Sequence, residues 1–298
     1  MFSPIAIFAY RRFEHLKHTL QSLMQCKEFA DSPVIVFMDG PRDITDQEDV
    51  EVTRAIAKQM LGERVRYVFR EKNIGLARSI ISGVTEVLDE FGTVIVIEDD
   101  LVVSSNFLKY MNDGLHFYRD IERVASIHGY CYPCKGTMPE TFFLRGADCW
   151  GWATWSRAWQ HFEPDGRKLL DDLQNSRLKR AFDMDGAYPY TRMLRNQIAG
   201  KNDSWAVRWH ASCFLLDKLT LYPGRSLVNN IGFDNSGTHC NATNVFAQSV
   251  SDDPVQIREI PIIESKSSKD TIVSYFRQHH SFRARMLRKF CSIMKLMN

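Results

Sequence analysis

Three consecutive carboxylates, Glu98, Asp99 and Asp100, are the residues of this sequence best suited to carry out chemistry. They directly follow Val-Ile-Val-Ile at 94–97, an apolar run typical of a strand buried on both faces. Adjacent acids repel one another and contribute nothing to packing, whereas hard oxygen ligands suit Mg²⁺ or Mn²⁺ that holds phosphate oxygens. A solvated acidic turn is the alternative, but the position after a buried strand favours a metal site.

The elements that must position these acids alternate along the first hundred residues. Apolar runs predict strands at 4–9, 33–38, 65–69 and 93–97, and helical periodicity predicts helices at 13–24, 45–61 and 76–88. Alternation at this spacing indicates βαβ units and a mostly parallel sheet. In such sheets ligands bind beyond the carboxyl ends of the strands. We therefore expect one functional rim, formed by residues 10–12, 39–40, 73–75 and 98–100.

The rim motifs resemble those of nucleotide-sugar transferases with the GT-A fold. Glu98-Asp99-Asp100-Leu101, preceded by Asn73-Ile-Gly-Leu-Ala-Arg78, is similar to the pattern of the N-acetylglucosaminyltransferase I group. Ala9-Tyr-Arg-Arg12 is similar to the first strand–helix unit of family-two bacterial glycosyltransferases. Blocks at 149–155, 203–205 and 226–232 look like the acceptor side of the same bacterial group, so the resemblance covers residues 4–240.

This resemblance implies an α/β fold with a Rossmann-like, mostly parallel central sheet flanked by helices. Residues 1–120 would form the nucleotide-sugar-binding half. Residues 121–264, whose periodicity is mixed, would form an α+β acceptor and catalytic half packed on it as one GT-A unit. Residues 265–298 would form a basic, amphipathic C-terminal tail.

The resemblance also assigns the donor site. Asp100 would be the direct ligand of Mn²⁺ or Mg²⁺, Asp99 would face the ribose or the sugar, and Glu98 would be a further donor-binding residue. Arg12 and Asp39 would bracket the nucleoside. The relatives often place a histidine after Leu-Ala-Arg, but Ser79 stands there in this sequence. The diphosphate contact is therefore expected from Arg78 or Arg145.

An inverting transferase needs a carboxylate that takes the proton of the acceptor hydroxyl. Asp203 is the candidate, because it precedes Trp205 where the relatives place their base. An ordinary loop acid or a helix cap is the alternative reading of Asp203, and Asp148 and Asp234 are reserve candidates.

All six tryptophans lie between residues 150 and 209. Sugars present C–H faces that stack on large rings, but tryptophan also fills protein cores. Of the six, we expect Trp152 and Trp205 to face the sugar or the acceptor. His239 is a candidate further ligand of the metal, although a single histidine is commonly structural.

Charge is distributed unevenly along the chain. The 38 Lys and Arg residues nearly balance 36 Asp and Glu residues, and the net charge of +2 argues against a dedicated nucleic-acid binder. Residues 265–298, however, carry +7, which leaves −5 for residues 1–264. Basic residues interleaved with apolar ones predict that the tail lies on an anionic membrane. Packing of the tail against the body is the alternative.

Seven scattered cysteines, including the pair Cys131 and Cys134, indicate reduced structural thiols and a cytoplasmic protein. No signal peptide or membrane span is expected. The sequence as a whole predicts an inverting, metal-dependent glycosyltransferase, peripheral at the inner face of the cell membrane. It would move a sugar from a donor such as UDP-GlcNAc to a glycan or lipid-linked acceptor of bacterial lipopolysaccharide or capsule. A non-catalytic nucleotide-sugar-binding scaffold and a sugar-phosphate nucleotidyltransferase are the alternatives.

Overall fold

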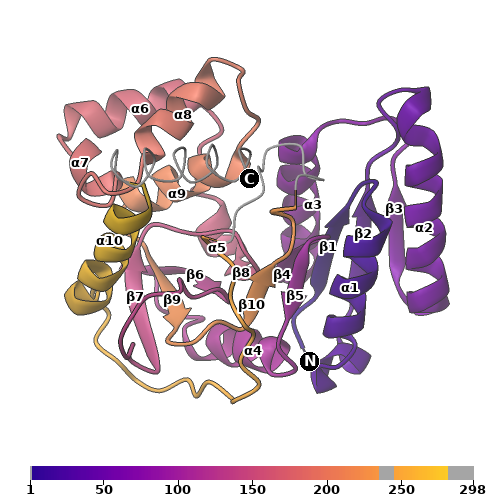
Figure 1. Cartoon of the computed structure of the whole chain (residues 1–298), viewed down its shortest axis with the longest axis horizontal. Coiled ribbons are helices and arrows are strands. Elements are labelled where there is room, and N and C mark those ends of the chain that lie inside the picture. Colours follow the sequence, from indigo (N-terminus) through magenta and orange to yellow (C-terminus); the bar gives the residue numbers. More distant parts are fainter. Residues whose placement is uncertain (1, 235–244, 281–298) are drawn as a thin grey trace, which may run out of the picture.

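An eight-stranded sheet runs through the computed structural model, which describes residues 2–234 and 245–280 (Figure 1). Its strands follow the order β3-β2-β1-β4-β8-β6-β9-β7. They are β1 (Ile5–Ala9), β2 (Val34–Met38), β3 (Arg66–Phe69), β4 (Thr93–Glu98), β6 (Val124–His128), β7 (Thr141–Arg145), β8 (Trp152–Trp155) and β9 (Leu219–Pro223). A separate two-stranded ribbon pairs β5 (Leu101–Val103) with β10 (Val228–Asn230) in antiparallel fashion.

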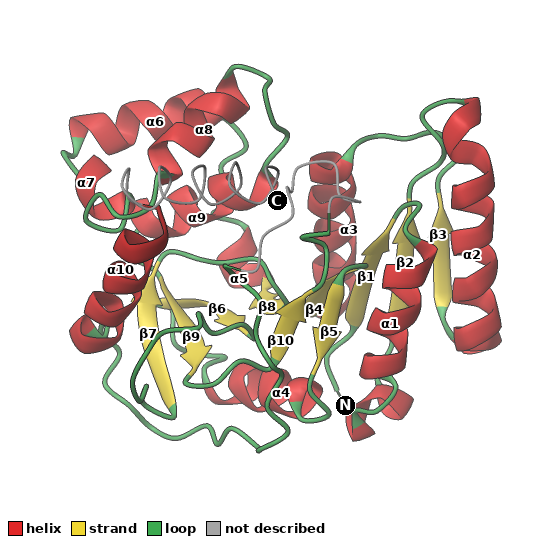
Figure 2. Ribbon diagram, viewed as in Figure 1, coloured by secondary structure: helices red, strands yellow, loops and turns green. Residues whose placement is uncertain are grey.

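Helices cover the sheet on both sides (Figure 2). They are α1 (Phe13–Leu23), α2 (Gln47–Leu61), α3 (Leu76–Phe91), α4 (Phe107–Phe117), α5 (Ser156–Trp159), α6 (Gly166–Asn175), α7 (Lys179–Phe182), α8 (Tyr190–Ile198), α9 (Trp205–Leu215) and α10 (Lys266–His280). Short 3₁₀ turns occupy Lys27–Asp31, Ile44–Asp46 and Gly62–Arg64. The expected α/β class and the strand–helix alternation of the first hundred residues are both confirmed.

The four strands built from the first hundred residues are all parallel. Ile5, Ile7 and Ile97 are fully buried, which explains why these strands read as continuous apolar runs rather than alternating ones. β8 then pairs antiparallel with both β4 and β6. The sheet is therefore continuous from the first half of the chain into the second.

The second half adds a small helical layer with its own core. Helices α6, α7, α8 and α9 enclose an apolar cluster that includes Leu169, Leu173, Phe182 and Leu194. This layer lies above the β7–β9 end of the sheet in Figure 1. The sequence analysis did not predict these helices, which are only 4 to 11 residues long.

The first part of the C-terminal tail packs on the body of the protein. Helix α10 buries Ile272 (0 % exposed) and Phe276 (1 %) in the main core. The ring of Phe276 lies 4.9 Å from that of Tyr132 and 4.6 Å from that of Tyr188, measured between centroids. The apolar residues of α10 are therefore not available to a membrane, and packing on the body is the correct reading for this helix. Residues 281–298 lie outside the described residues.

Cys131 and Cys134 are not reactive thiols in this structure. Burial raises the pKa of both Cys131 and Cys134 to about 12, which keeps these thiols protonated and unreactive, as structural cysteines are. Among the described residues, no helix is both long and apolar enough to cross a bilayer.

The packing of α10 gives a stability prediction. Phe276→Ala should lower the free energy of unfolding by about 3–5 kcal/mol, because it leaves a cavity against two tyrosine rings. Arg277→Ala, on the exposed side of the same helix, should change it by less than about 0.5 kcal/mol. Guanidinium unfolding monitored by circular dichroism measures both. Equal midpoints for the two variants would contradict the packing described here.

Candidate functional site

Strand pairing brings the acidic triplet and the segment after β1 together. Phe8 pairs with Glu98 across the parallel strands, so both chains leave the sheet side by side. The amide of Tyr10 then donates to Asp99 Oδ2 at 3.3 Å, and Thr19 Oγ1 donates to the carbonyl of Asp99 at 2.8 Å. The predicted rim is thus present at this point of the sheet.

One guanidinium, that of Arg12, bonds to two of the three carboxylates. Arg12 Nη2 donates to Asp99 Oδ1 and, at 2.9 Å, to Asp100 Oδ2. Asp99 is buried, whereas the side chain of Asp100 is 15 % exposed. Burial raises the pKa of Asp99, and Arg12 opposes that rise. Burial and the two neighbouring carboxylates raise the pKa of Glu98 to about 8. The triplet therefore contains more carboxyl groups than one guanidinium can neutralise.

The end of the β5–β10 ribbon closes over Asp100. The amide of Ile231 donates to the carbonyl of Asp100 at 2.9 Å. A Cβ at Gly232 would lie 2.2 Å from Asp100 Oδ2 and 3.0 Å from Arg12 Nη1. Only glycine fits there, so the carboxylate is enclosed by backbone on this side. Nearby, His15 Nε2 lies 3.1 Å from Asp234 Oδ2.

The residues present suit a divalent cation that is coordinated partly by the protein and partly by a bound phosphate compound. Within residues 2–234 and 245–280, no three His, Cys, Asp or Glu side chains are arranged to hold a metal by themselves. Asp99 and Asp100, however, already bind one cationic group, the guanidinium of Arg12, through hard carboxylate oxygens. A cation that takes one or two ligands from the protein and the others from phosphate oxygens suits this arrangement.

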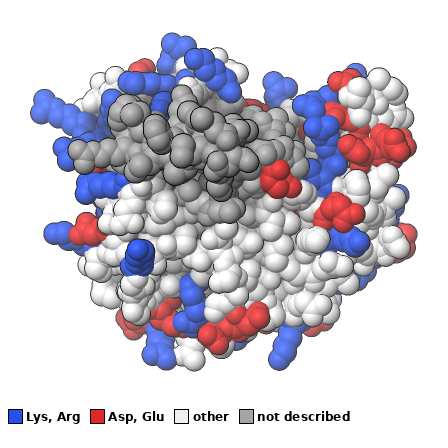
Figure 3. Space-filling model, in the orientation of Figure 1, with Lys and Arg blue, Asp and Glu red and all other residues white. Residues whose placement is uncertain are grey.

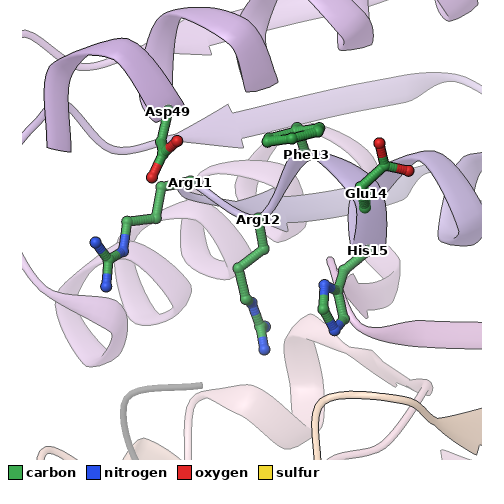
Figure 4. A pocket seen from close by; sticks show the side chains of 6 residues that line it. All are labelled: Arg11, Arg12, Phe13, Glu14, His15 and Asp49. Carbon is green, nitrogen blue, oxygen red and sulfur yellow. The ribbon is translucent and has the colours of Figure 1, made fainter. Parts of the chain in front are cut away.

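A pocket of about 300 Å³ opens beside Arg12, at the start of α1 (Figure 4). Its lining includes Arg11, Phe13 and Asp49. Tyr10 and Arg11 are held by the buried Asp46, which accepts from the tyrosine hydroxyl and from the guanidinium at 2.6 Å each. The sequence analysis did not select Asp46 as a site residue, because its position in a helix-capping pattern does not predict contacts with residues far away in the sequence.

Asp39 fixes the loop that leads into α3. It is 5 % exposed, and its Oδ2 accepts from the amides of Ile74 and Gly75 at 3.1 Å each. Its Oδ1 accepts from Arg70 Nη1 at 3.1 Å. Arg70, a residue that the sequence analysis missed, also donates to Ser79 Oγ at 2.7 Å. The serine at the position of the family's histidine is therefore turned inward.

Asp203 meets the same loop from the other half of the chain. Its Oδ2 accepts from the amide of Ala77, in the first turn of α3, at 3.3 Å. Its side chain is 54 % exposed, and Arg208 Nη2 lies 3.9 Å from its Oδ1. A carboxylate at a helix N-terminus is favourable, so Asp203 acts structurally as a cap of α3. That contact also places it on the rim, whereas Arg78 is exposed one residue further along α3.

Arg145 does not join this group. It ends β7, which runs opposite to β4, and it pairs with Leu219 at the start of β9. Three strands lie between β7 and β4, a separation of about 19 Å at the usual strand spacing. The guanidinium instead donates to the carbonyl of Phe214 at 2.9 Å and lies over its ring. Arg145 is therefore at the wrong end of the sheet for the expected diphosphate contact.

The two tryptophans predicted to face a sugar are buried in the core. Trp152 is 0 % exposed and Trp205 2 %, and their rings stack on each other with centroids 5.3 Å apart. Trp150 is the half-exposed member of the motif, and its ring lies 5.5 Å from that of Phe233, next to Gly232. Trp152 lies within β8, whereas Trp150 precedes the strand, a distinction that the bare motif did not show. His239 lies outside the described residues.

Residues 5–138 match the family described as glycosyl transferase family 2. The expected resemblance to family-two glycosyltransferases, and to that class of enzyme, is thus confirmed for this part of the chain. The match includes Arg12, Asp39 and the triplet and ends before Asp203. Among curated proteins, none matches the chain significantly.

Several solved structures resemble part of the chain. A mannosyltransferase from Pyrobaculum calidifontis, solved with GDP-Man and Mn²⁺, is 14 % identical over 42 % of this chain and 34 % of its own, with a TM-score of 0.32. GalNAc-T7 with UDP, GalNAc and Mn²⁺ is 9 % identical over 54 % and 37 %, with a TM-score of 0.41. A cytidylyltransferase from Leptospira borgpetersenii is 16 % identical over 53 % and 62 %, with a TM-score of 0.35. This chain thus spans about a third of the length of the two transferases, and at such scores these likenesses do not distinguish one chemistry from another.

The raised pKa of Glu98 gives a pH prediction. An acid whose pKa rises from 4.5 to about 8 on folding destabilises the folded state progressively between those values. Glu98→Gln should therefore lie close to the wild-type stability at pH 5 and exceed it at pH 9, by on the order of 4 kcal/mol. Guanidinium unfolding with a chelator present tests this, with the exposed Glu48→Gln as control. Parallel pH curves for the wild type and Glu98→Gln would refute it.

Proposed function

We propose that this protein is an inverting, metal-dependent glycosyltransferase that takes a sugar from a nucleotide donor such as UDP-GlcNAc. The observation that carries the proposal is the pair Asp99 and Asp100. These acids end a buried strand, they bind a cationic group, and they lie within the region that matches glycosyl transferase family 2. The acceptor would be a glycan or lipid-linked glycan of bacterial lipopolysaccharide or capsule.

Asp100, supported by Asp99, would hold Mn²⁺ or Mg²⁺, and His239 would be a further ligand. The ion would stabilise the negative charge that develops on the departing diphosphate. Arg12 occupies this place in the structure, so on donor binding its guanidinium would be shared between the carboxylates and the donor. Glu98, behind the pair, would limit how much negative charge the site carries.

The donor would lie along the rim between Arg12 and the start of α3. Both carboxylate oxygens of Asp39 hold protein groups, so its main contribution would be a fixed 73–75 loop beside the nucleoside. Arg78 is exposed in the first turn of α3 and would reach the diphosphate. Ser79 cannot take the role of the family's histidine while Arg70 holds it.

Asp203 would be the general base. Its carboxylate is fixed on one side by the amide of Ala77 and remains half-exposed. It would accept the proton of the acceptor hydroxyl as that oxygen attacks the anomeric carbon and the bond to the diphosphate breaks. Attack from the face opposite the leaving group inverts the configuration.

A donor panel tests the function. Wild-type protein with Mn²⁺ should be stabilised thermally by at least one nucleotide sugar and should release its nucleoside diphosphate in the presence of an acceptor. Asp100→Ala should abolish the metal-dependent shift and lower turnover by about 10²–10³-fold. Asp113→Ala, an exposed change on α4, is the control.

Other outcomes of the donor panel would indicate other functions for this protein. Stabilisation without turnover would favour a binding scaffold, and release of pyrophosphate from a nucleoside triphosphate would favour a nucleotidyltransferase. Failure of every donor to bind, together with an inert Asp100→Ala, would refute the transferase.

The base assignment gives a separate prediction. Asp203→Asn keeps an oxygen that can accept from Ala77, so folding and the donor Kd should stay within about twofold of wild type. The kcat for transfer should fall by about 10²–10⁴-fold. Calorimetric donor titration and a transfer assay measure the two effects, and full transfer by the variant would remove Asp203 from the mechanism.

We also propose that the protein works at an anionic membrane surface. Exposed Lys and Arg residues gather over helices α6–α8, visible as blue side chains at the upper left of Figure 3. They include Arg167, Arg177, Lys179, Arg180, Arg192 and Arg195. A basic face on an otherwise acidic body would orient the molecule toward anionic lipid. Residues 281–298 contain five further Lys and Arg residues.

Vesicle flotation tests the membrane proposal. Phosphatidylglycerol-containing vesicles should carry the wild type at low salt and lose most of it when Arg177, Lys179 and Arg180 are all changed to Glu. Lys58→Glu, on α2, should float as wild type does. Removal of residues 281–298 separates the contribution of the tail from that of the helices. A charge-reversed protein that floats normally would refute the assignment of this face.

A further inference from the structure

A half-buried carboxylate lies among aromatic rings on the segment that joins β7 to β8. Asp148 Oδ2 accepts from the hydroxyl of Tyr132 at 2.6 Å, and its Oδ1 accepts from the amide of Cys149 at 3.0 Å. In the part of the chain that the structure describes, no Lys or Arg forms an ion pair with it. Asp148 thus differs from Asp39, Asp46, Asp99 and Asp100, each of which has an arginine partner.

The rings near Asp148 form a connected set. The ring of Tyr132 lies 5.3 Å from that of Tyr130, which lies 4.8 Å from that of Trp150. Phe276 connects Tyr132 to Tyr188, and the ring of Tyr188 lies 4.6 Å from that of Tyr190 at the start of α8. Burial, followed by the charge of Asp148, raises the pKa of Tyr190 well above its ordinary value, which keeps that hydroxyl protonated beside Asp148 and Tyr132. Asp148, Trp150, Tyr188 and Tyr190 are all half-buried.

This combination suits a neutral sugar. A carboxylate offers about four acceptor sites, and Asp148 uses two of them, so hydroxyl donors would complete its hydrogen bonding. Aromatic rings accept the apolar C–H faces that a sugar presents beside its hydroxyls. An anion would be repelled by the carboxylate. Carbohydrate is therefore the chemical class that the group matches.

We infer that Asp148, with Trp150 and Tyr190, binds a sugar residue of the acceptor. The role as an acceptor subsite rests on the proposed function, whereas the binding of a sugar does not. Trp150 links this group to the donor site, since its ring contacts Phe233, the neighbour of the glycine that covers Asp100. These residues all follow residue 138 and so lie beyond the part of the chain that matches the family.

Saturation-transfer NMR on the full chain with UDP and Mn²⁺ tests the inference. The probes are methyl glycosides of glucose, galactose, mannose, N-acetylglucosamine and rhamnose. At least one should bind the wild type, and Asp148→Asn, Trp150→Leu and Tyr190→Phe should each weaken it at least tenfold. Asp171→Asn, which removes an exposed carboxylate of α6 in the same half, should leave binding unchanged. Thermal melts establish that each variant is folded.

Two results would overturn the inference: wild-type affinity in every folded variant, or no glycoside bound by the folded wild type. Nucleotide binding, followed in the same samples, separates this failure from that of the proposed function. UDP bound without any glycoside leaves the transferase standing and removes the acceptor subsite. Glycoside binding that depends on Asp148, without nucleotide binding, leaves a carbohydrate site on a protein that is not a transferase.

Discussion

Three carboxylates side by side at the end of a buried strand are the constraint on which this structure depends. Like charges in a poorly solvated place are strongly unfavourable unless a partner is supplied. Arg12 is that partner, and it reaches Asp99 and Asp100 only because β1 lies directly against β4. The glycine that closes the ribbon over Asp100 meets the same demand, since a side chain there would displace the ion pair.

The same solution recurs along the rim. Asp39 pairs with Arg70 from the end of β3, and Asp46 pairs with Arg11 from the end of β1. Each pair joins segments that leave different strands, so each fixes one loop of the site against another. Breaking such a pair would leave a buried charge without a partner, which is strongly unfavourable. The pairs therefore stay formed and hold these loops in place before any ligand binds. A rim of this kind is organised in advance, as the proposed nucleotide-sugar donor would require.

Sequence reasoning succeeded where one segment determines its own structure. The parallel strands have continuous apolar runs, their helices have clear periodicity, and the triplet follows a strand, so the fold class and the rim could be predicted. Prediction from the sequence failed where the position of a residue depends on segments far apart in the chain. The direction of β7 puts Arg145 at the far end of the sheet, and the register of β8 buries Trp152 while Trp150 stays half-exposed. The partners Arg70 and Asp46 depend on which strand ends are neighbours, which no local pattern encodes.

Helix α10 has a consequence for how this chain is made. Its Ile272 and Phe276 complete a core whose other side includes Tyr132, a residue synthesised about 140 positions earlier. Domains on the ribosome begin to fold from the N-terminus, and the four parallel strands here all lie within the first hundred residues. The face that α10 covers stays open until residues 266–280 have left the exit tunnel. During that interval the nascent chain exposes the aromatic rings of Tyr132 and Tyr188 to solvent.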